Sequence, residues 1–172
     1  ERELRAGDAP GMTMAASGAG AVGDPGLSGA FRIDREGVWR HEEVEVTHPG
    51  VLRNLYANLR VDGESYHLQV GPLRIPVHVD DTPFVVVRAE PGADPGSVAV
   101  HLSDGSHEPL EAETLVLDRR GIPYCRVKGG RFRARFSVSA WLQLAEAVEI
   151  DPRSGEPTLV LGDRRIPLRR SD

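Results

Sequence analysis

One short pattern occurs twice in the sequence, and it limits the folds that the chain can adopt. Residues 70–77 and 161–168 both read apolar, Gly, any two residues, Arg, Ile, Pro, apolar. In the first copy Gly71-Pro72 indicates a turn before a strand whose alternate residues, from Leu73 to Val79, are apolar. The same order of hairpin, helix and hairpin is expected around each copy. The repeat therefore predicts an internal duplication.

The other elements follow from turn residues and apolar spacing. Residues 31–46 predict a hairpin, and Thr47 or His48 before Pro49 predicts the start of a helix that ends at Asp62-Gly63. In the second half, Gly129-Gly130 predicts a hairpin, and a helix is expected over about 139–149. Further strands are expected at 66–70, 73–79, 84–89, 97–102 and 113–118, with a last hairpin at 159–168.

These elements predict an α+β fold of two similar lobes, each made of antiparallel β hairpins packed with one helix. The expected boundaries are a flexible tail at 1–28, a first lobe at 29–84 and a second lobe at 85–172. The tail contains six Gly and six Ala, a composition that buries too little apolar surface to offset the entropy of ordering. A cleft is expected between the lobes, with Asp80-Asp81 beside it.

Composition and the missing motifs exclude several classes of protein. The formal net charge of −5 argues against a general nucleic-acid binder. No apolar run approaches the roughly 20 residues of a membrane helix, and no secretory signal is evident at the start. The single cysteine, Cys125, excludes an internal disulfide and fits a reducing cytoplasm. The phosphate-loop, His-Glu-x-x-His and Gly-x-Ser-x-Gly motifs are absent. A cytoplasmic protein without a cofactor is expected, and no oligomeric state is indicated.

A basic cluster is the strongest chemical feature of this acidic chain. From Arg119 to Arg135 there are seven cations and no acid. A two-residue turn at Gly129-Gly130 fixes the pairing of the hairpin, so that Arg126 faces Arg133. On the same side Lys128 faces Arg131 and Tyr124 faces Arg135, whereas the other side carries Cys125, Val127, Phe132, Ala134 and Phe136 and suits a core. Cys125 is therefore expected to be a buried, unreactive thiol.

Facing cations destabilise a sheet by up to about 1 kcal/mol per pair, so an anion is expected over this side. A phosphate or carboxylate ligand would supply it, because guanidinium groups bind such groups in a bidentate manner. The alternative is that the acids of the chain itself cover the cations. The candidates are Asp80, Asp81, Glu111, Glu113, Glu146 and Glu149.

A second, weaker candidate is the polar side of the strand before Asp81. Arg74, His78 and Asp80 alternate along it. His78 and Asp80 could hold a metal ion with His101 or His107, or act as an acid–base pair. An exposed strand surface or an internal ion pair is the alternative interpretation, and it is the favoured one.

Several short segments resemble one bacterial family. The most specific is Val79-x-Asp81-x-Pro83-Phe84. The others are Gly29–Ile33 with Gly37-Val38-Trp39, Tyr66-His67-Leu68, Pro123-Tyr124 with Val127, and Phe132 and Ala134 before Trp141–Leu144. Over about 29–168 the chain resembles the domain of unknown function 1285 (DUF1285) family. The resemblance implies two similar lobes and a cleft that takes a nucleotide-like ligand in signalling. The chain departs from the family pattern at Val70–Leu73, which lacks an acid, and at Val138, where an arginine is expected.

The sequence thus predicts a non-catalytic protein that binds a small anionic, nucleotide-like ligand between two lobes. In this hypothesis arginines hold the anion, Tyr124 stacks or hydrogen bonds, and Asp81 orients a cation or a ligand hydroxyl. Two alternatives stay open: a protein-interaction module that uses the basic sheet face, and a metal-assisted hydrolase at His78, Asp80 and Asp81. The predicted ligand-binding residues are Arg74, Asp80, Asp81, Tyr124, Arg126, Arg133 and Arg135; no catalytic or metal-binding residue is assigned.

Overall fold

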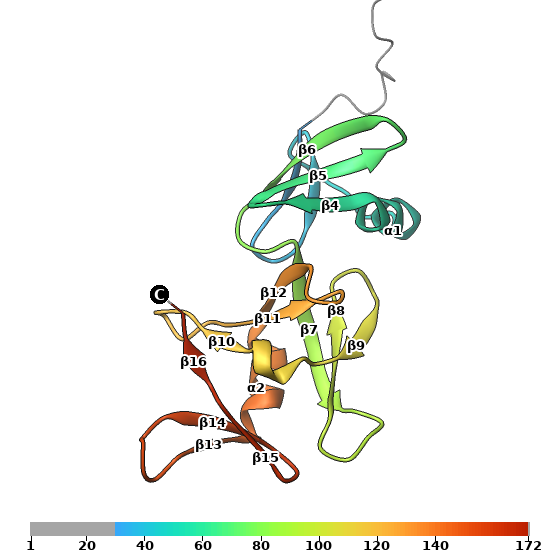
Figure 1. The fold of residues 1–172 in the computed structure, drawn as a ribbon. Helices are drawn as coiled ribbons and strands as arrows, with labels where there is room; N and C mark the ends of the chain where they lie inside the picture. The colour runs from blue at the N-terminus through green and yellow to red at the C-terminus, as the bar shows by residue number, and fades with distance from the viewer. Residues whose placement is uncertain (1–29, 172) are drawn as a thin grey trace, which may run out of the picture.

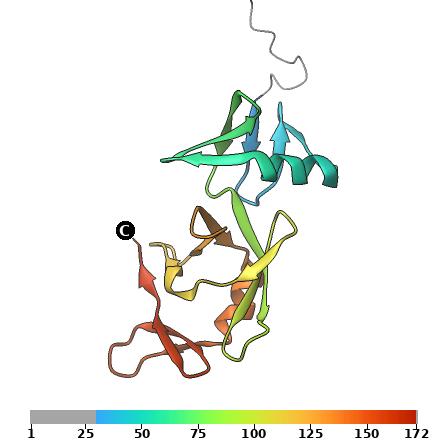
Figure 2. The ribbon, with the colours of Figure 1, turned by 45° about the vertical axis from the view of Figure 1, so that its right-hand side comes forward.

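A computed structural model describes residues 30–171 of the chain as a mixed α/β fold with two α-helices and three β-sheets. A six-stranded sheet and α1 (Pro49–Asn58) lie at one end of the molecule, and the other two sheets with α2 (Val138–Ala145) lie at the other end (Figure 1; Figure 2). The predicted 1–28 tail falls outside the described residues.

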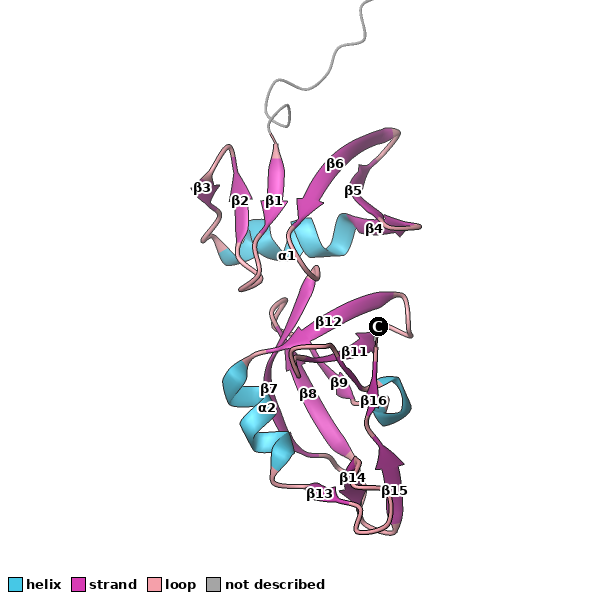
Figure 3. Ribbon diagram, turned by 90° about the vertical axis from the view of Figure 1, so that its left-hand side faces the viewer, coloured by secondary structure: helices cyan, strands magenta, loops and turns pink. Residues whose placement is uncertain are grey.

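The six-stranded sheet has the order β3-β2-β1-β6-β5-β4. Strands β1 and β6 are parallel, and every other neighbouring pair is antiparallel. Helix α1 runs across this sheet (Figure 3). The strands are β1 (Phe31–Ile33), β2 (Trp39–His41), β3 (Val44–Glu45), β4 (Leu59–Asp62), β5 (Ser65–Val70) and β6 (Leu73–Val79).

The seven-stranded sheet has the order β16-β10-β11-β12-β7-β8-β9, in which β10–β16 and β12–β7 are parallel pairs. Helix α2 packs against β7 and β12 (Figure 3). A three-stranded meander, β13-β14-β15, completes the fold. The strands are β7 (Phe84–Pro91), β8 (Val98–Leu102), β9 (His107–Pro109), β10 (Val116–Leu117), β11 (Pro123–Val127), β12 (Phe132–Phe136), β13 (Val148–Ile150), β14 (Pro157–Leu161), β15 (Arg164–Pro167) and β16 (Arg169–Arg170), and a 3-10 turn covers Ala112–Thr114.

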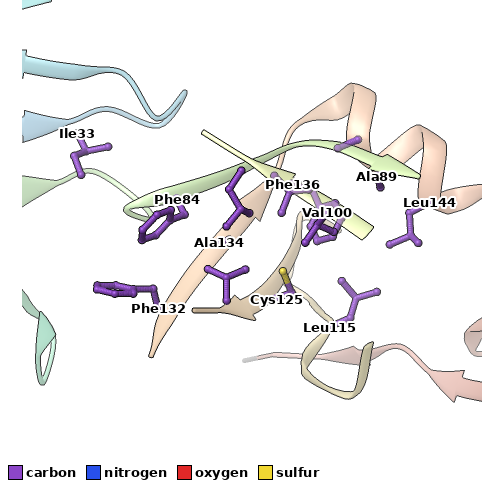
Figure 4. Close-up of a cluster of buried hydrophobic side chains, with 14 of the residues drawn as sticks. Ile33, Phe84, Ala89, Val100, Leu115, Cys125, Phe132, Ala134, Phe136 and Leu144 are labelled. Carbon is purple, nitrogen blue, oxygen red and sulfur yellow. The ribbon is translucent and has the colours of Figure 1, made fainter. Parts of the chain in front are cut away.

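The hydrophobic core runs without a break from one end of the molecule to the other. Phe84, at the start of β7, is 2% exposed, and its ring lies 5.2 Å from Tyr56 of α1 and 5.2 Å from Phe132 of β12. Phe84, Phe132 and Ala134 lie together near the junction, and Leu144 of α2 lies further along (Figure 4). The two ends therefore share one core through this junction.

Both predicted helices are shorter in the structure, for a local reason. The His48 side chain caps α1 by accepting from the Gly50 N–H at 3.1 Å, as the position before Pro49 suggested. The helix ends at Asn58, not at Asp62-Gly63, because Leu59 takes extended dihedrals and pairs with Leu68. Likewise α2 begins after the Ser137 cap and ends at Ala145. Pairing in a sheet thus overrides the helical spacing of both segments.

Both Ile-Pro pairs occupy the third strand of an antiparallel meander. In β4-β5-β6 Leu68 faces Ile75, and in β13-β14-β15 Leu159 faces Ile166. The predicted alternation along β6 holds in part: Val77 is buried, but Leu73 is 41% exposed because it lies at the end of the hairpin. The strand predicted at 113–118 is replaced by the 3-10 turn and the short β10.

Candidate functional site

The β11–β12 hairpin has the predicted register from Tyr124–Arg135 to Val127–Phe132. The expected pairing of Lys128 with Arg131 is not formed, because both residues lie in the loop, and Lys128 Nζ lies 5.3 Å from the centre of the buried Phe84 ring. Tyr124 faces Arg135 and Arg126 faces Arg133. Lys128, Gly129 and Gly130 all have positive φ, which glycine adopts at little cost and which closes a tight loop between the strands. The opposite side is core, as expected: Cys125, Val127, Phe132, Ala134 and Phe136 are all buried.

Lys128 is neutralised by the chain itself. Its Nζ donates to Asp104 Oδ2 at 2.7 Å and to Ser106 Oγ at 2.5 Å. Burial alone would raise the pKa of Asp104, but the hydrogen bonds from Lys128 and Ser106 outweigh burial and lower it. An acid of the chain itself therefore covers this cation, but Asp104 was not among the expected candidates.

Asp81 occupies the outer end of the same hairpin face. The Tyr124 hydroxyl donates to both Asp81 oxygens, at 3.0 and 3.2 Å, and Arg135 Nη1 lies 3.7 Å from Oδ2. Burial and the charge of Asp81 raise the pKa of Tyr124, so the phenol stays protonated at neutral pH. Asp81 thus has the role of a partner for Tyr124 and Arg135, two of the residues with which it was grouped in the sequence.

Arg126 and Arg133 differ from Lys128 and Arg135 in having no acidic partner among the described residues. No carboxylate of residues 30–171 lies within 4.0 Å of either guanidinium group. The Arg133 guanidinium carbon lies 3.9 Å from the centre of the Tyr124 ring. A stack of this kind holds the guanidinium plane in place and leaves its edges free to donate. The predicted like-charge pair is therefore present, and one of its members is fixed by an aromatic ring.

Tyr66 of β5 lies within the electrostatic reach of this pair from the six-stranded sheet. Burial raises the pKa of Tyr66, the positive charges of Arg126 and Arg133 lower it, and the charge of Asp81 raises it. Sequence reasoning missed Tyr66 as a neighbour of the pair, because only the folded arrangement brings β5 close to β11 and β12.

A pocket of about 450 Å³ lies over the Arg126–Arg133 face. Its cations are Arg126, Arg133 and Arg169, and its one acid, Glu113, is already paired with Arg164. Arg169 was also missed, because nothing in the sequence indicates that β16 pairs with β10. The full lining is Glu113, Thr114, Val116, Tyr124, Cys125, Arg126, Arg133, Arg169 and Ser171. All of these residues belong to the expected second lobe, so this pocket does not lie in the cleft that was predicted between the lobes.

A smaller pocket of about 240 Å³ lies on the other side of Tyr124 and brings together four of the predicted residues. Its charges are balanced between three arginines and three aspartates. Arg32 donates to both oxygens of Asp80, at 3.0 and 2.8 Å, and lowers the Asp80 pKa. The lining is Arg35, Asp80, Asp81, Asp118, Arg120, Ile122, Tyr124 and Arg135.

Arg74 lies apart from the other predicted residues. It contacts Asp62 at 3.1 Å on the exposed β4–β5–β6 surface and lines neither pocket. The metal-ion candidate is separated: His78 lies 3.2 Å from Asp80, but His101, one of its possible further ligands, bonds Glu90 at 2.7 Å and stacks on His107, the other. In the described part of the chain, no three His, Cys, Asp or Glu residues are grouped to hold a metal ion.

Cys125 is expected to react only when the protein unfolds. It is 1% exposed, and burial raises the pKa of its thiol to about 12. At pH 8 the folded protein should consume a disulfide reagent at least about a hundredfold more slowly than in denaturant, because the thiolate is the reactive form. The absorbance of the released aromatic thiol measures this rate, and rapid labelling of the folded chain would contradict the assignment.

The comparisons with known proteins concern the fold. The structure superposes on a DUF1285 family protein from Silicibacter pomeroyi DSS-3 with a TM-score of 0.67 and 22% identity, covering 81% of this chain and 79% of that one. A DUF1285 family protein from Shewanella baltica OS155 gives a TM-score of 0.60 and 17% identity, covering 70% of this chain and 93% of that one. This chain has the fold of the DUF1285 proteins.

The DUF1285 resemblance that the sequence predicts is therefore confirmed for the fold. No protein-family model matches the sequence, and no curated protein matches it. Among the described residues, neither helix has the length and apolar character needed to span a bilayer. At these identities the likeness transfers the DUF1285 architecture and no activity.

Proposed function

We propose that this protein binds a small anionic, nucleotide-like ligand in the pocket over Arg126 and Arg133, without catalysing a reaction, and that it serves a cytoplasmic signalling role. The observation that carries the proposal is a pair of facing guanidinium groups without a carboxylate partner in residues 30–171, one of which is stacked on Tyr124. The nucleotide-like character comes from the DUF1285 resemblance.

The charge balance around the pocket supports an external anion. Lys128 and Arg135 are neutralised by Asp104 and Asp81, so the acids near the hairpin are already engaged. Arg126, Arg133 and Arg169 remain around a volume of about 450 Å³, which is within the range of small-molecule sites. A phosphate group there would accept from two guanidinium groups and remove the repulsion between them.

We also infer that the chain contains two copies of one unit, β1–β6 with α1 and β10–β16 with α2. In the first copy the strand order is β3-β2-β1-β6-β5-β4. The corresponding strands of the second copy are, in the same order, β12, β11, β10, the pair β15 and β16, β14 and β13. In the first copy β6 carries Ile-Pro and pairs in parallel with β1. In the second copy β15 carries Ile-Pro, and β16, which follows it directly, pairs in parallel with β10. Strands β7–β9 extend the second copy from the free edge of β12.

The strongest support for the duplication is a turn that occurs in both copies. Ile33-Asp34-Arg35-Glu36-Gly37-Val38 and Leu117-Asp118-Arg119-Arg120-Gly121-Ile122 are similar in sequence. Asp34 Oδ1 accepts from the N–H groups of Glu36 and Val38, and Asp118 Oδ1 accepts from those of Arg120 and Ile122. The two turns both contribute to the 240 Å³ pocket, through Arg35 and Arg120. The duplication thus places related segments on two sides of one pocket.

The ligand proposal predicts thermal stabilisation by nucleotides that depends on the arginine pair. Nucleoside mono- and diphosphates should raise the midpoint of unfolding of the wild type, because a ligand bound only to the folded state stabilises it. Replacing Arg126 and Arg133 by Gln should weaken binding by about a hundredfold, since each charge-assisted hydrogen bond contributes about 1.5–3 kcal/mol. Fluorimetry over a nucleotide concentration series gives both quantities.

The control for this experiment is Arg153→Gln, which removes an exposed arginine of the β13–β14 turn. It should behave as the wild type. Absence of any shift in the wild type, or equal shifts in the double variant, would remove the proposal.

A protein-interaction function is the second candidate, and the exposure of Arg126 favours it. An Asp- and Glu-rich peptide should then bind the wild type and not the double variant, while nucleotides give no shift. Binding of both probes at the same residues would instead indicate a general anion preference of this face.

A further inference from the structure

A separate pocket of about 300 Å³ lies between α1 and the tip of the β11–β12 hairpin. It shares no lining residue with the pocket over Arg126 and Arg133. One wall comes from the six-stranded sheet and its helix, and the other comes from the seven-stranded sheet. Tyr56, Phe84 and Phe132 lie behind the lining, with their rings almost entirely buried in the core.

Positive charge from both sheets converges on this junction pocket. Arg53 and Arg60 come from α1 and β4, and Lys128 and Arg131 come from the hairpin tip. The single acid in the lining, Asp104, already accepts from Lys128 at 2.7 Å and from the Ser106 hydroxyl at 2.6 Å. Within residues 30–171, no carboxylate lies within 4.0 Å of the three arginine side chains. Three guanidinium groups are therefore gathered in a chain whose formal net charge is −5.

Two of these arginines are held by the main chain. Arg60 Nη1 donates to the carbonyls of Ala57 and Leu59, both at 2.8 Å. Arg131 Nε donates to the carbonyl of Lys128 at 3.0 Å, and its guanidinium carbon lies 5.9 Å from the centre of the Phe132 ring. In each arginine these hydrogen bonds use one guanidinium nitrogen and leave the other two free to donate to a ligand. A ligand would thus meet groups that are already partly oriented, which lowers the entropy lost on binding.

We propose that the junction pocket is a second anion-binding site, for a small molecule that carries a phosphate, a pyrophosphate or several carboxylates. Such a group accepts from guanidinium groups on both walls at once. Because the ligand contacts both sheets, it stabilises the contact between them. The site is independent of the proposed nucleotide pocket, since the lining residues differ.

The test uses inorganic pyrophosphate and citrate as probes, at constant ionic strength set with sodium chloride. Saturable binding by calorimetry is expected for at least one probe in the wild type. Replacing Arg53 and Arg131 by Gln should weaken it by about a hundredfold, because two charge-assisted contacts are lost. Arg60 is kept in this variant, since its side chain also binds the end of α1. Comparison of the two probes separates a phosphate site from a carboxylate site.

Two controls separate this site from the other proposal. Arg153→Gln and the Arg126→Gln, Arg133→Gln double variant should both retain probe binding. Amide chemical shifts give a readout without mutation, and pyrophosphate should move Arg53, Lys128 and Arg131 before Arg126. If the Arg126→Gln, Arg133→Gln variant loses probe binding and the Arg53→Gln, Arg131→Gln variant keeps it, the anion binds in the pocket over Arg126 and Arg133, and the junction-pocket proposal is wrong. The absence of saturable binding with both probes would also overturn the proposal.

Discussion

Replacing Phe84 by Ala is expected to lower the free energy of unfolding by about 3–5 kcal/mol, the usual cost of deleting a buried phenyl ring. The side chain is 2% exposed and lies between Tyr56 and Phe132, so its loss leaves a cavity where the two sheets meet. Domains of this size are stable by only about 5–15 kcal/mol. Urea unfolding followed by circular dichroism and tryptophan fluorescence measures the change.

The two tryptophans make this experiment informative about cooperativity. Trp39 lies on β2 and Trp141 on α2, so single-tryptophan variants report on opposite ends of the molecule. One shared transition is expected for the wild type because the core is continuous, and separate transitions are expected after Phe84→Ala. Phe84→Leu should cost less than about 1.5 kcal/mol, and Leu142→Ala, at a 62% exposed position, less than about 0.5 kcal/mol. Two separate transitions in the wild type would contradict the coupling.

Gly37→Ala is expected to have the second largest effect on stability, at about 2–5 kcal/mol. Gly37 has φ +82°, which costs a side-chain-bearing residue about 1–2 kcal/mol. A Cβ there would also lie 2.9 Å from Cγ2 of the buried Val85, and such overpacking costs about 1–3 kcal/mol. The turn of the first unit is thus packed directly on β7. Denaturant midpoints and slopes give the change in stability.

Gly121→Ala is the matched control, because Gly121 occupies the corresponding position of the second turn. Its φ is +78°, yet a Cβ there would meet no atom within 4 Å. Only the conformational cost of about 1–2 kcal/mol is expected. The difference between the two variants therefore measures the packing of the turn against Val85. Equal losses would mean that this contact relaxes without cost.

The register of the β11–β12 hairpin could be predicted because it depends on local chemistry. Gly129-Gly130 permits the tight loop, and once the loop is fixed the four pairs of the ladder follow, including Arg126 with Arg133. The burial of Cys125 follows from the same alternation. The DUF1285 resemblance was carried by short segments, and it proved sufficient to indicate the fold.

The counter-ion of Lys128 could not be predicted in the same way, because Asp104 reaches it from the distant β8–β9 turn. Asp81 was among the acids expected to cover the cluster, but its pairing with Tyr124 and Arg135 depends on the fold. Charge spacing along a sequence carries no information about such approaches. The junction pocket was missed for the same reason, since Arg53 and Arg131 meet only through the packing of α1 on the hairpin tip.

The three parallel pairings of the described residues have a consequence for how fast the protein folds. β1 pairs with β6 through Phe31 and Val77, β7 with β12 through Phe84 and Ala134, and β10 with β16 through Val116 and Arg169. Each pairing closes a long loop, whose entropy must be lost before the contact is gained. Local hairpins such as β5–β6 and β11–β12 should therefore form early, with the parallel ladders later. We expect refolding on a scale of milliseconds to seconds, typical of proteins rich in non-local strand contacts.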